Sequence, residues 1–259
     1  MEKISSRNNE KIKMAVKVRT SSACRDENSV YFLEGARLCA DVSEYVDITE
    51  AFFTEAALKK YSAEADKVIK TAGKSYLITE EVAEKLSDTK GPQGIFCICK
   101  KSTADLKVET GKKYIALENV QNPSNVGAIA RTAEAMGIDG LIINSGCDIY
   151  NPKTLRAAMG SLQRLTVIET DDIVKLLTEA KEIGIKTVAA VLDTDNSNMG
   201  VLKAESIICI VGNEGNGITD ETAEIADEKL KIPMKGRTES LNVATAAAIL
   251  MWEMTNLQD

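Results

Sequence analysis

Four polar side chains gather around a proline and a glycine in residues 119–131, directly after the apolar run 114–117. A strand-to-helix turn needs a breaker and a helix cap, which Pro123 and Ser124 or Asn125 would supply. Such a turn has no need for three amide side chains and an arginine six residues beyond Asn125. The excess predicts a polar pocket at the start of a helix, and it favours an enzyme. The four residues are Asn119, Asn122, Asn125 and Arg131.

Two later loops carry a similar excess of polar and glycine residues. Residues 207–218 run from an apolar strand into a loop with three glycines, where an ordinary turn has no need of Glu214. Glycines after a strand let the backbone approach a flat ligand closely. Their order differs from the dinucleotide fingerprint, so a tight structural turn explains this loop as well as a ligand site does. In residues 232–244, a helix cap explains Ser240 or Asn242, but not both.

The chain contains no histidine. This absence excludes Ser-His-Asp and Cys-His catalysis and removes the commonest metal ligand, so we expect no metal. Acid–base chemistry must use Glu, Asp, Lys, Arg, Tyr or water. The six cysteines form no C-x-x-C pair and predict reduced thiols in a cytoplasmic protein. We expect no membrane contact, because no run of 18 apolar residues occurs and the first residues lack the apolar core of a signal peptide.

The net charge of −7 is distributed unevenly along the chain. Residues 1–113 contain 20 basic and 18 acidic residues, a balance of +2, whereas residues 114–259 contain 12 and 21, a balance of −9. The first 25 residues alone contain seven basic residues and two acidic ones. This basic segment indicates either a solvated helix face or an element that contacts phosphates.

Short alternating segments in the first hundred residues predict a compact α/β domain. We expect helices at 1–22, 36–43, 54–60 and 80–86, and strands at 29–35, 46–49, 67–71, 75–79 and 95–100. The polar stretch 100–113 is typical of a linker. We therefore predict a first domain at 1–105, a linker at 106–113 and a second domain at 114–259.

The second domain alternates more clearly, and its apolar strands are typical of a parallel sheet. We expect strands at 114–118, 140–144, 166–168, 186–192 and 206–211. We expect helices at 126–136, 152–161, 171–183, 219–226 and 242–257. The last helix has an apolar stripe that predicts either burial against the sheet or a helix contact between subunits. The stripe consists of Val243, Ala247, Leu250 and Met254.

Three motifs resemble those of the SpoU (TrmH-like) RNA ribose methyltransferases of the SPOUT superfamily, in order and spacing. They are Asn-Pro-Ser-Asn-Val-Gly-Ala-Ile-Ala-Arg at 122–131, Val-Gly-Asn-Glu-Gly-Asn-Gly-Ile at 211–218, and Ile-Pro-Met with Ser-Leu-Asn-Val-Ala between 232 and 244. Residues 151–160 are also similar to this family. Residues 32–37 and 91–94 resemble the RNA-binding domain of its rRNA-modifying members. One departure is Asn122, which stands where many relatives have Asp but keeps the capping acceptor.

The resemblance implies methyl transfer from S-adenosylmethionine to a ribose 2′-hydroxyl in RNA, with rRNA favoured over tRNA. It also implies an α/β fold with a mostly parallel sheet, a deep trefoil knot and a homodimer. A tRNA methyltransferase and a catalytically silent RNA-binding or ribosome-assembly protein of the same fold remain alternatives. The glycine order argues against a nucleotide-dependent oxidoreductase.

The resemblance also implies roles for individual residues. Arg131 would contact the target phosphate and the 2′-oxygen, while Asn125 and Asn242 would orient the hydroxyl. Glu214 would fix Arg131 or accept the proton through water. The cofactor would be bound by Gly212, Gly217, Ile232, Met234 and Leu241. RNA would be contacted by Arg7, Lys11, Arg19, Arg37 and Arg156, although Arg156 could equally solvate a helix start.

Overall fold

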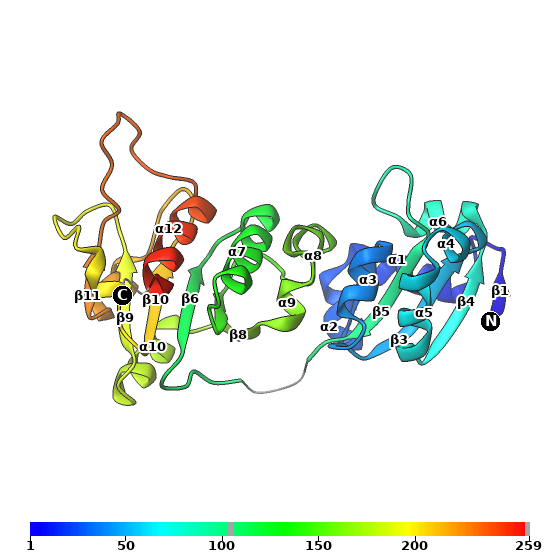
Figure 1. Cartoon of the computed structure of the whole chain (residues 1–259), viewed down its shortest axis with the longest axis horizontal. Helices are drawn as coiled ribbons and strands as arrows, with labels where there is room; N and C mark the ends of the chain where they lie inside the picture. The colour runs from blue at the N-terminus through cyan, green and yellow to red at the C-terminus, as the bar shows by residue number, and fades with distance from the viewer. Residues whose placement is uncertain (103–105, 257–259) are drawn as a thin grey trace. The chain divides into compact units, whose positions relative to one another are not determined.

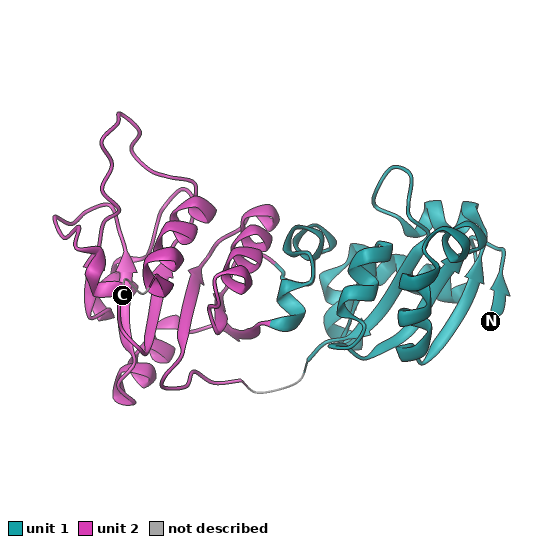
Figure 2. Ribbon diagram, in the orientation of Figure 1, with its two compact units in different colours: residues 1–103, 148–164 teal, residues 104–147, 165–259 magenta. Residues whose placement is uncertain are grey.

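The computed structural model describes residues 1–102 and 106–256, and the chain divides into two compact units (Figures 1 and 2). Unit 1 consists of residues 1–103 and 148–164, and unit 2 consists of residues 104–147 and 165–259. The segment 148–164 therefore belongs to unit 1, although the surrounding sequence belongs to unit 2. No helix among the described residues is long and apolar enough to cross a membrane.

Unit 1 is built on a five-stranded sheet in the order β1-β4-β3-β5-β2. Strands β1, β3 and β4 are parallel to one another, whereas β5 runs antiparallel to both β2 and β3. The strands are β1 (Glu2–Ile4), β2 (Val30–Glu34), β3 (Ile48–Thr54), β4 (Lys74–Ile78) and β5 (Ile95–Lys100). The helices are α1 (Glu10–Thr20), α2 (Ser22–Asn28), α3 (Ala36–Val42), α4 (Glu55–Lys60), α5 (Ser62–Thr71), α6 (Glu80–Leu86), α8 (Pro152–Ala158) and α9 (Ser161–Arg164).

Aromatic rings fill the core of unit 1 on one side of this sheet. Phe32 and Phe96 face each other across the β2–β5 pair with ring centroids 5.9 Å apart, and Phe52 stacks on Tyr76 at 5.3 Å. All four rings are buried beside apolar residues of α1 and α6. This core therefore anchors the basic helix α1 through residues such as Ile12.

Ion pairs and ring contacts hold the segment 148–164 against the rest of unit 1. The guanidinium of Arg25, a residue only 3% exposed, binds the carboxylate of Asp148, with Nε 3.1 Å from Oδ2. The rings of Tyr31 and Tyr150 lie 4.9 Å apart. Because Arg25 is buried, loss of Asp148 would leave its charge without a carboxylate partner, which is costly.

Unit 2 contains a fully parallel six-stranded sheet in the order β11-β9-β10-β6-β7-β8. The strands are β6 (Lys113–Glu118), β7 (Gly140–Asn144), β8 (Thr166–Thr170), β9 (Lys186–Ala190), β10 (Ile207–Val211) and β11 (Glu228–Leu230). The helices are α7 (Pro123–Ala135), α10 (Ile173–Glu182), the short 3₁₀ helix η1 (Met199–Leu202), α11 (Asp220–Ile225) and α12 (Val243–Thr255). The predicted α/β class with a mostly parallel sheet is confirmed.

Helices cover both faces of the parallel sheet. Alternate residues of β6, such as Tyr114 and Ala116, pack with Ile173 and Leu177 of α10 on one face. Helices α7 and α12 contact each other and the other face of the sheet. The carboxyl ends of the parallel strands meet at one edge, so the loops that follow β6, β9 and β10 come together there.

Most predicted elements are present, but several boundaries were wrong. Residues 67–71 are not a strand but the end of α5, where Ala65 and Val68 are buried at helical spacing. Strand β3 extends to Thr54 instead of ending at residue 49, because Phe52 and Phe53 lie in a run of four buried residues without alternation.

Three further predictions about the elements need correction. Residues 1–22 form β1, helix α1 and the first residue of α2 instead of one helix, since Asn9 caps α1 and Ser21 caps α2. The helix predicted at 152–161 is interrupted at Met159 and Gly160, which both have positive φ. Strand β11 was not predicted. Helix α12 ends at Thr255, before the predicted end at 257. The predicted domain boundary at 105 lies outside the described residues.

Candidate active site

A cavity of about 500 Å³ lies at the carboxyl edge of the parallel sheet in unit 2. Its walls come from the residues after β9, the glycine loop after β10, and the segment between β11 and α12. All five residues predicted to bind the cofactor line it. They are Gly212, Gly217, Ile232, Met234 and Leu241. Segments that are far apart in sequence therefore form one site, as the parallel topology requires.

The glycine loop is closed on itself beside the cavity. Asn213 and Gly217 exchange two backbone hydrogen bonds, both 2.9 Å long. Gly217 has φ of +72°, a conformation that favours glycine. A Cβ atom on Gly212 would lie only 2.1 Å from the carbonyl carbon of Gly217. These two glycines are thus required by the tight loop itself, and the loop forms a wall of the cavity.

A chain of three side chains links the three sequence motifs. Asn125 Nδ2 donates to Glu214 Oε1 at 2.7 Å, and Asn242 Nδ2 donates to Asn125 Oδ1 at 3.2 Å. Asn242 Oδ1 also caps α12 by accepting from the backbone N–H of Ala244 at 3.0 Å. This cap fixes which way the Asn242 amide points, and the chain then fixes the Asn125 amide as well.

The cap of α7 leaves Asn125 available for this chain. Asn122, not Ser124 or Asn125, is the N-cap, and its Oδ1 accepts from the backbone N–H of Ser124 at 2.9 Å. Pro123 occupies the first turn, where its missing N–H has no cost. The amide of Asn125 is therefore free to contact the loops across the sheet edge.

Arg131 lies apart from these three side chains within the chain. It is exposed on α7, six residues beyond Asn125, so the two side chains point about 120° apart around the helix axis. Glu214 contacts Asn125, and no hydrogen bond or ion pair joins Arg131 to another residue of the described ranges. The predicted contact between Glu214 and Arg131 is thus not formed within one chain.

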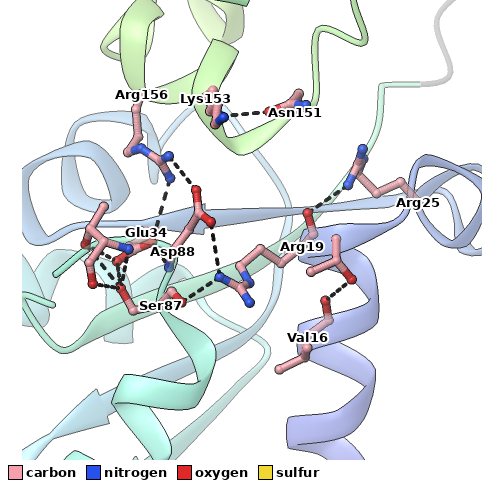
Figure 3. A network of polar contacts seen from close by, with 11 residues as sticks. Val16, Arg19, Arg25, Glu34, Ser87, Asp88, Asn151, Lys153 and Arg156 are labelled. Atoms are coloured by element: carbon pink, nitrogen blue, oxygen red, sulfur yellow. Dashed lines mark hydrogen bonds and ion pairs between the residues drawn. The ribbon is translucent and has the colours of Figure 1, made fainter.

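Two arginines that were predicted to contact RNA bind a shared acid inside unit 1 (Figure 3). Arg156 Nη2 lies 2.8 Å from Asp88 Oδ2, and Arg19 Nη1 lies 3.5 Å from Asp88 Oδ1. Arg19 also donates to the carbonyl of Ser87 at 2.5 Å, and Arg156 approaches Glu34 at 3.8 Å. These guanidinium groups are therefore neutralised by acids within the chain.

The other three predicted RNA-binding residues differ in exposure. Lys11 donates to Glu50 at 3.0 Å and lies over the ring of Tyr76 at 5.0 Å. Its hydrogen bonds with Tyr76 and Glu50 raise the pKa of Lys11 well above its usual value. The Arg37 side chain is 79% exposed and pairs with Asp41 at 3.4 Å on the same helix, and Arg7 is exposed. Arg37 and Arg7 are the better placed of the five for an external phosphate.

The sequence interpretation missed several residues of the site. Residues 191–193 line the cavity, whereas the sequence interpretation placed 191 and 192 within a strand. Asn213 binds the carbonyl of Asn119 through its side chain, and Glu118 binds Thr219. Their position in the sequence could have identified them, because they lie at or just after the carboxyl ends of parallel strands, which share one edge of the sheet.

Comparison with known proteins places both units among RNA-modifying enzymes. Residues 112–252 match the SpoU rRNA Methylase family, and residues 9–97 match the MRM3-like substrate binding domain. The chain is 31% identical over 255 residues to the 23S rRNA (guanosine(2553)-2′-O)-methyltransferase RlmP of Bacillus subtilis, covering 98% of this chain and 99% of that protein.

Solved structures show the same architecture along the whole chain. An AdoMet-bound rRNA methyltransferase from Sinorhizobium meliloti superposes with a TM-score of 0.85 at 26% identity, covering 98% of this chain and 97% of that one. A TrmH-family RNA methyltransferase described as putative, from Porphyromonas gingivalis, gives a TM-score of 0.83 at 26% identity, covering 95% and 97%. These matches confirm the resemblance seen in the three motifs, and the chain belongs to the SpoU rRNA Methylase family.

Proposed function

We infer that this chain transfers a methyl group from S-adenosylmethionine to a ribose 2′-hydroxyl in structured RNA, and that ribosomal RNA is its substrate. One observation carries the inference: the cavity is lined by every residue predicted to hold the cofactor, and Glu214 connects its wall to Asn125. Family membership and the relative named as a 23S rRNA 2′-O-methyltransferase support the same activity.

The residues present suit this cofactor. The cavity of about 500 Å³ falls in the range of roughly 300–1,000 Å³ that is usual for small-molecule sites. Ile232, Met234 and Leu241 would enclose a flat purine, and the backbone of the glycine loop would offer hydrogen bonds. When bound, S-adenosylmethionine supplies a methyl group that is already a strong electrophile. The task left to the protein is to orient the ribose oxygen.

Asn125 and Asn242 are the groups that would orient the ribose hydroxyl. Each amide nitrogen uses one hydrogen in the Asn242–Asn125–Glu214 chain and keeps a second hydrogen for an external oxygen. Glu214 Oε1 holds Asn125, and none of the described residues donates to its Oε2. We assign Oε2 as the atom that accepts the hydroxyl proton through a water molecule.

Arg131 would stabilise negative charge on the target phosphate and the 2′-oxygen. A guanidinium stays protonated in proteins, so Arg131 does not act as the base. Because Arg131 points away from Asn125 of its own chain, we propose that a homodimer brings it to the site of the second copy.

The same proposal covers the domains and the location. Residues 1–105 would bind the RNA substrate, and residues 114–259 would catalyse the methyl transfer. Residues 106–113 would be the linker between these two domains. The match of residues 9–97 to a substrate binding domain supports the first assignment. All six cysteines are free thiols, which supports a reducing, cytoplasmic location.

The test combines binding and product mapping. Calorimetry on the purified chain should detect binding of S-adenosylmethionine and no binding of NAD. Binding of NAD would support the oxidoreductase alternative. Ribosomal RNA and tRNA from cells lacking the gene are then incubated with the enzyme and labelled cofactor, and 2′-O-methyl positions are mapped. Methylation of tRNA alone would support the tRNA alternative. RNA binding without cofactor binding would identify a catalytically silent protein.

A further inference from the structure

Glu118, the last residue of β6, is a buried carboxylate that binds the exit of the glycine loop. The residue is only 4% exposed. It accepts from the Thr219 hydroxyl at 2.7 Å, the Thr222 hydroxyl at 2.8 Å and the backbone N–H of Thr219 at 3.0 Å. Thr219 and Thr222 begin helix α11 directly after the glycine loop. The carboxylate thus joins two segments that are 101 residues apart in sequence.

These partners are all uncharged groups. No ion pair to Glu118 occurs among the described residues, so hydrogen bonds alone offset the loss of its hydration. A buried carboxylate without a cation is costly unless its oxygens are well satisfied. A neutral side chain could fill the same space with less risk to stability, so the carboxylate points to a role in holding these particular donors.

The next residue, Asn119, holds the start of the same loop. Its φ of +54° turns the backbone so that its carbonyl accepts from Asn213 Nδ2 at 2.9 Å. Asn213 Oδ1 in turn accepts from the backbone N–H groups of Gly215 at 2.8 Å and Asn216 at 3.2 Å. Residues 118 and 119 therefore fasten both ends of the loop 212–219, which lines the cavity.

We propose that Glu118 is a positioning residue for cofactor binding, which fixes the glycine loop through Thr219 and Thr222 without touching the cofactor itself. The proposal rests on the proposed function of the cavity. Glu214, which holds Asn125, sits in the middle of the same loop. A loop released at its exit would lose the cofactor surface first, whereas the hydroxyl-orienting chain would reform once the cofactor is bound at saturation.

The first readout is the affinity for S-adenosylmethionine, measured by calorimetry without RNA. Glu118→Ala should raise Kd on the order of tenfold, because three buried donors lose their acceptor. When the cofactor is varied at saturating RNA, KM for the cofactor should rise similarly, while kcat should stay within about twofold of wild type. Glu118→Gln keeps one acceptor oxygen and should restore part of the affinity. If Glu118→Ala does not fold, the Thr222→Val variant is measured in its place. This substitution removes one of the three donors with little change in side-chain shape.

Unit 1 offers a matched control in Glu34, which is 7% exposed. Its carboxylate accepts from Ser87 Oγ, from the Asp88 backbone N–H at 3.1 Å and from Thr89 Oγ1 at 2.8 Å. Glu34→Ala should lower the melting temperature but leave the cofactor Kd unchanged. An equal rise of Kd in both variants would overturn the proposal, because the effect would then be general destabilisation.

The second readout is hydrogen exchange of the Asn213 and Gly217 amides, whose mutual bonds close the loop. Both amides should exchange faster in Glu118→Ala, with or without cofactor, and not in Glu34→Ala. Unchanged protection in Glu118→Ala would overturn the positioning role, even if the wild-type chain did not bind S-adenosylmethionine. Failure of the wild type to bind would overturn the proposed function separately.

Discussion

The amide of Asn125 donates to the carboxylate of Glu214 at 2.7 Å, although 89 residues separate the two in sequence. This bond connects the first turn of α7 to the glycine loop of the cavity. It occupies only one oxygen of the carboxylate, so the other oxygen remains for the proposed proton acceptance. The two residues can therefore be tested against each other.

Asn125→Ala should lower kcat by about 100-fold, because a misplaced nucleophile loses roughly that factor. The cofactor Kd should stay near the wild-type value, since Asn125 does not line the cavity. Glu214→Gln should also slow turnover and remove an acidic limb from the pH–rate profile. An unchanged rate and profile in Glu214→Gln would exclude proton acceptance by this carboxylate.

Gly212→Ala should weaken cofactor binding by about tenfold or more, because the new Cβ would overlap the backbone of Gly217 and displace the loop. Gly236→Ala is the matched control. A Cβ at Gly236 meets no atom within 4 Å, so its Kd should match that of the wild type. Titration calorimetry compares the two, and equal affinities would show that the tight loop is not needed for the cofactor.

Arg131→Lys should lower kcat/KM by roughly 10- to 100-fold, since lysine keeps the charge but loses the two-pronged donor geometry. The measurement is single-turnover methylation of rRNA at saturating cofactor. Near-normal turnover would contradict the two-pronged contact. Mixing Arg131→Lys with Asn125→Ala subunits tests the homodimer, because a shared site restores activity in a mixed pair.

The carboxylate of Asp227 should make the stability of unit 2 depend on pH in the acidic range. Burial opposes its ionisation, but hydrogen bonds from Thr187 and the ion pair with Lys181 at 3.0 Å outweigh it and hold the pKa below the usual 3.8. A lowered folded pKa contributes stability that is complete above the unfolded pKa and is lost as pH falls through the folded one. Melting temperature should therefore fall below about pH 4. Asp227→Asn should be less stable at pH 7, with a shallower decline on acidification.

Arg37 and Arg156 should behave differently in RNA binding. Arg37→Ala should weaken binding and reduce the slope of log K against log salt by about one, as the loss of one phosphate contact does. Arg156→Ala should mainly lower the melting temperature, because its guanidinium holds Asp88 (Figure 3). Filter binding at several salt concentrations and thermal melts separate the two effects. A reduced salt slope in Arg156→Ala would instead support the prediction that Arg156 contacts RNA.

The sequence predicted the parallel sheet because its buried strands leave strong local signals. Apolar runs mark β6, β7 and β10. Gly212 and Gly217 were assigned to the cofactor through the family resemblance, and the structure adds that a Cβ at Gly212 would overlap Gly217. Residue type alone could not reveal partners. Arg19 and Arg156 are typical RNA-binding residues, yet Asp88, which neutralises both, is 68 residues from Arg156.

Other features could not be predicted, because the segments that form them are too short to show a periodic pattern or depend on partners that are distant in sequence. Strand β11 has three residues, and its place beside β9 follows from the order of the sheet and not from its own composition. Glu118 reads as the polar end of a strand until Thr219 and Thr222 are brought to it. Long-range hydrogen bonds of this kind have no signature in a single sequence.

The ion pair between Arg25 and Asp148 has a consequence for dissecting the chain. A fragment ending near residue 103 would keep the bond from Arg25 to the carbonyl of Val18 but would lose the only carboxylate partner of Arg25 in the described ranges. The complementary fragment would carry α8 and α9 with their packing surface bare. The sequences of the two units are thus interleaved. A single cut near residue 103 would leave Arg25 in one fragment and Asp148 in the other, and so would break their ion pair.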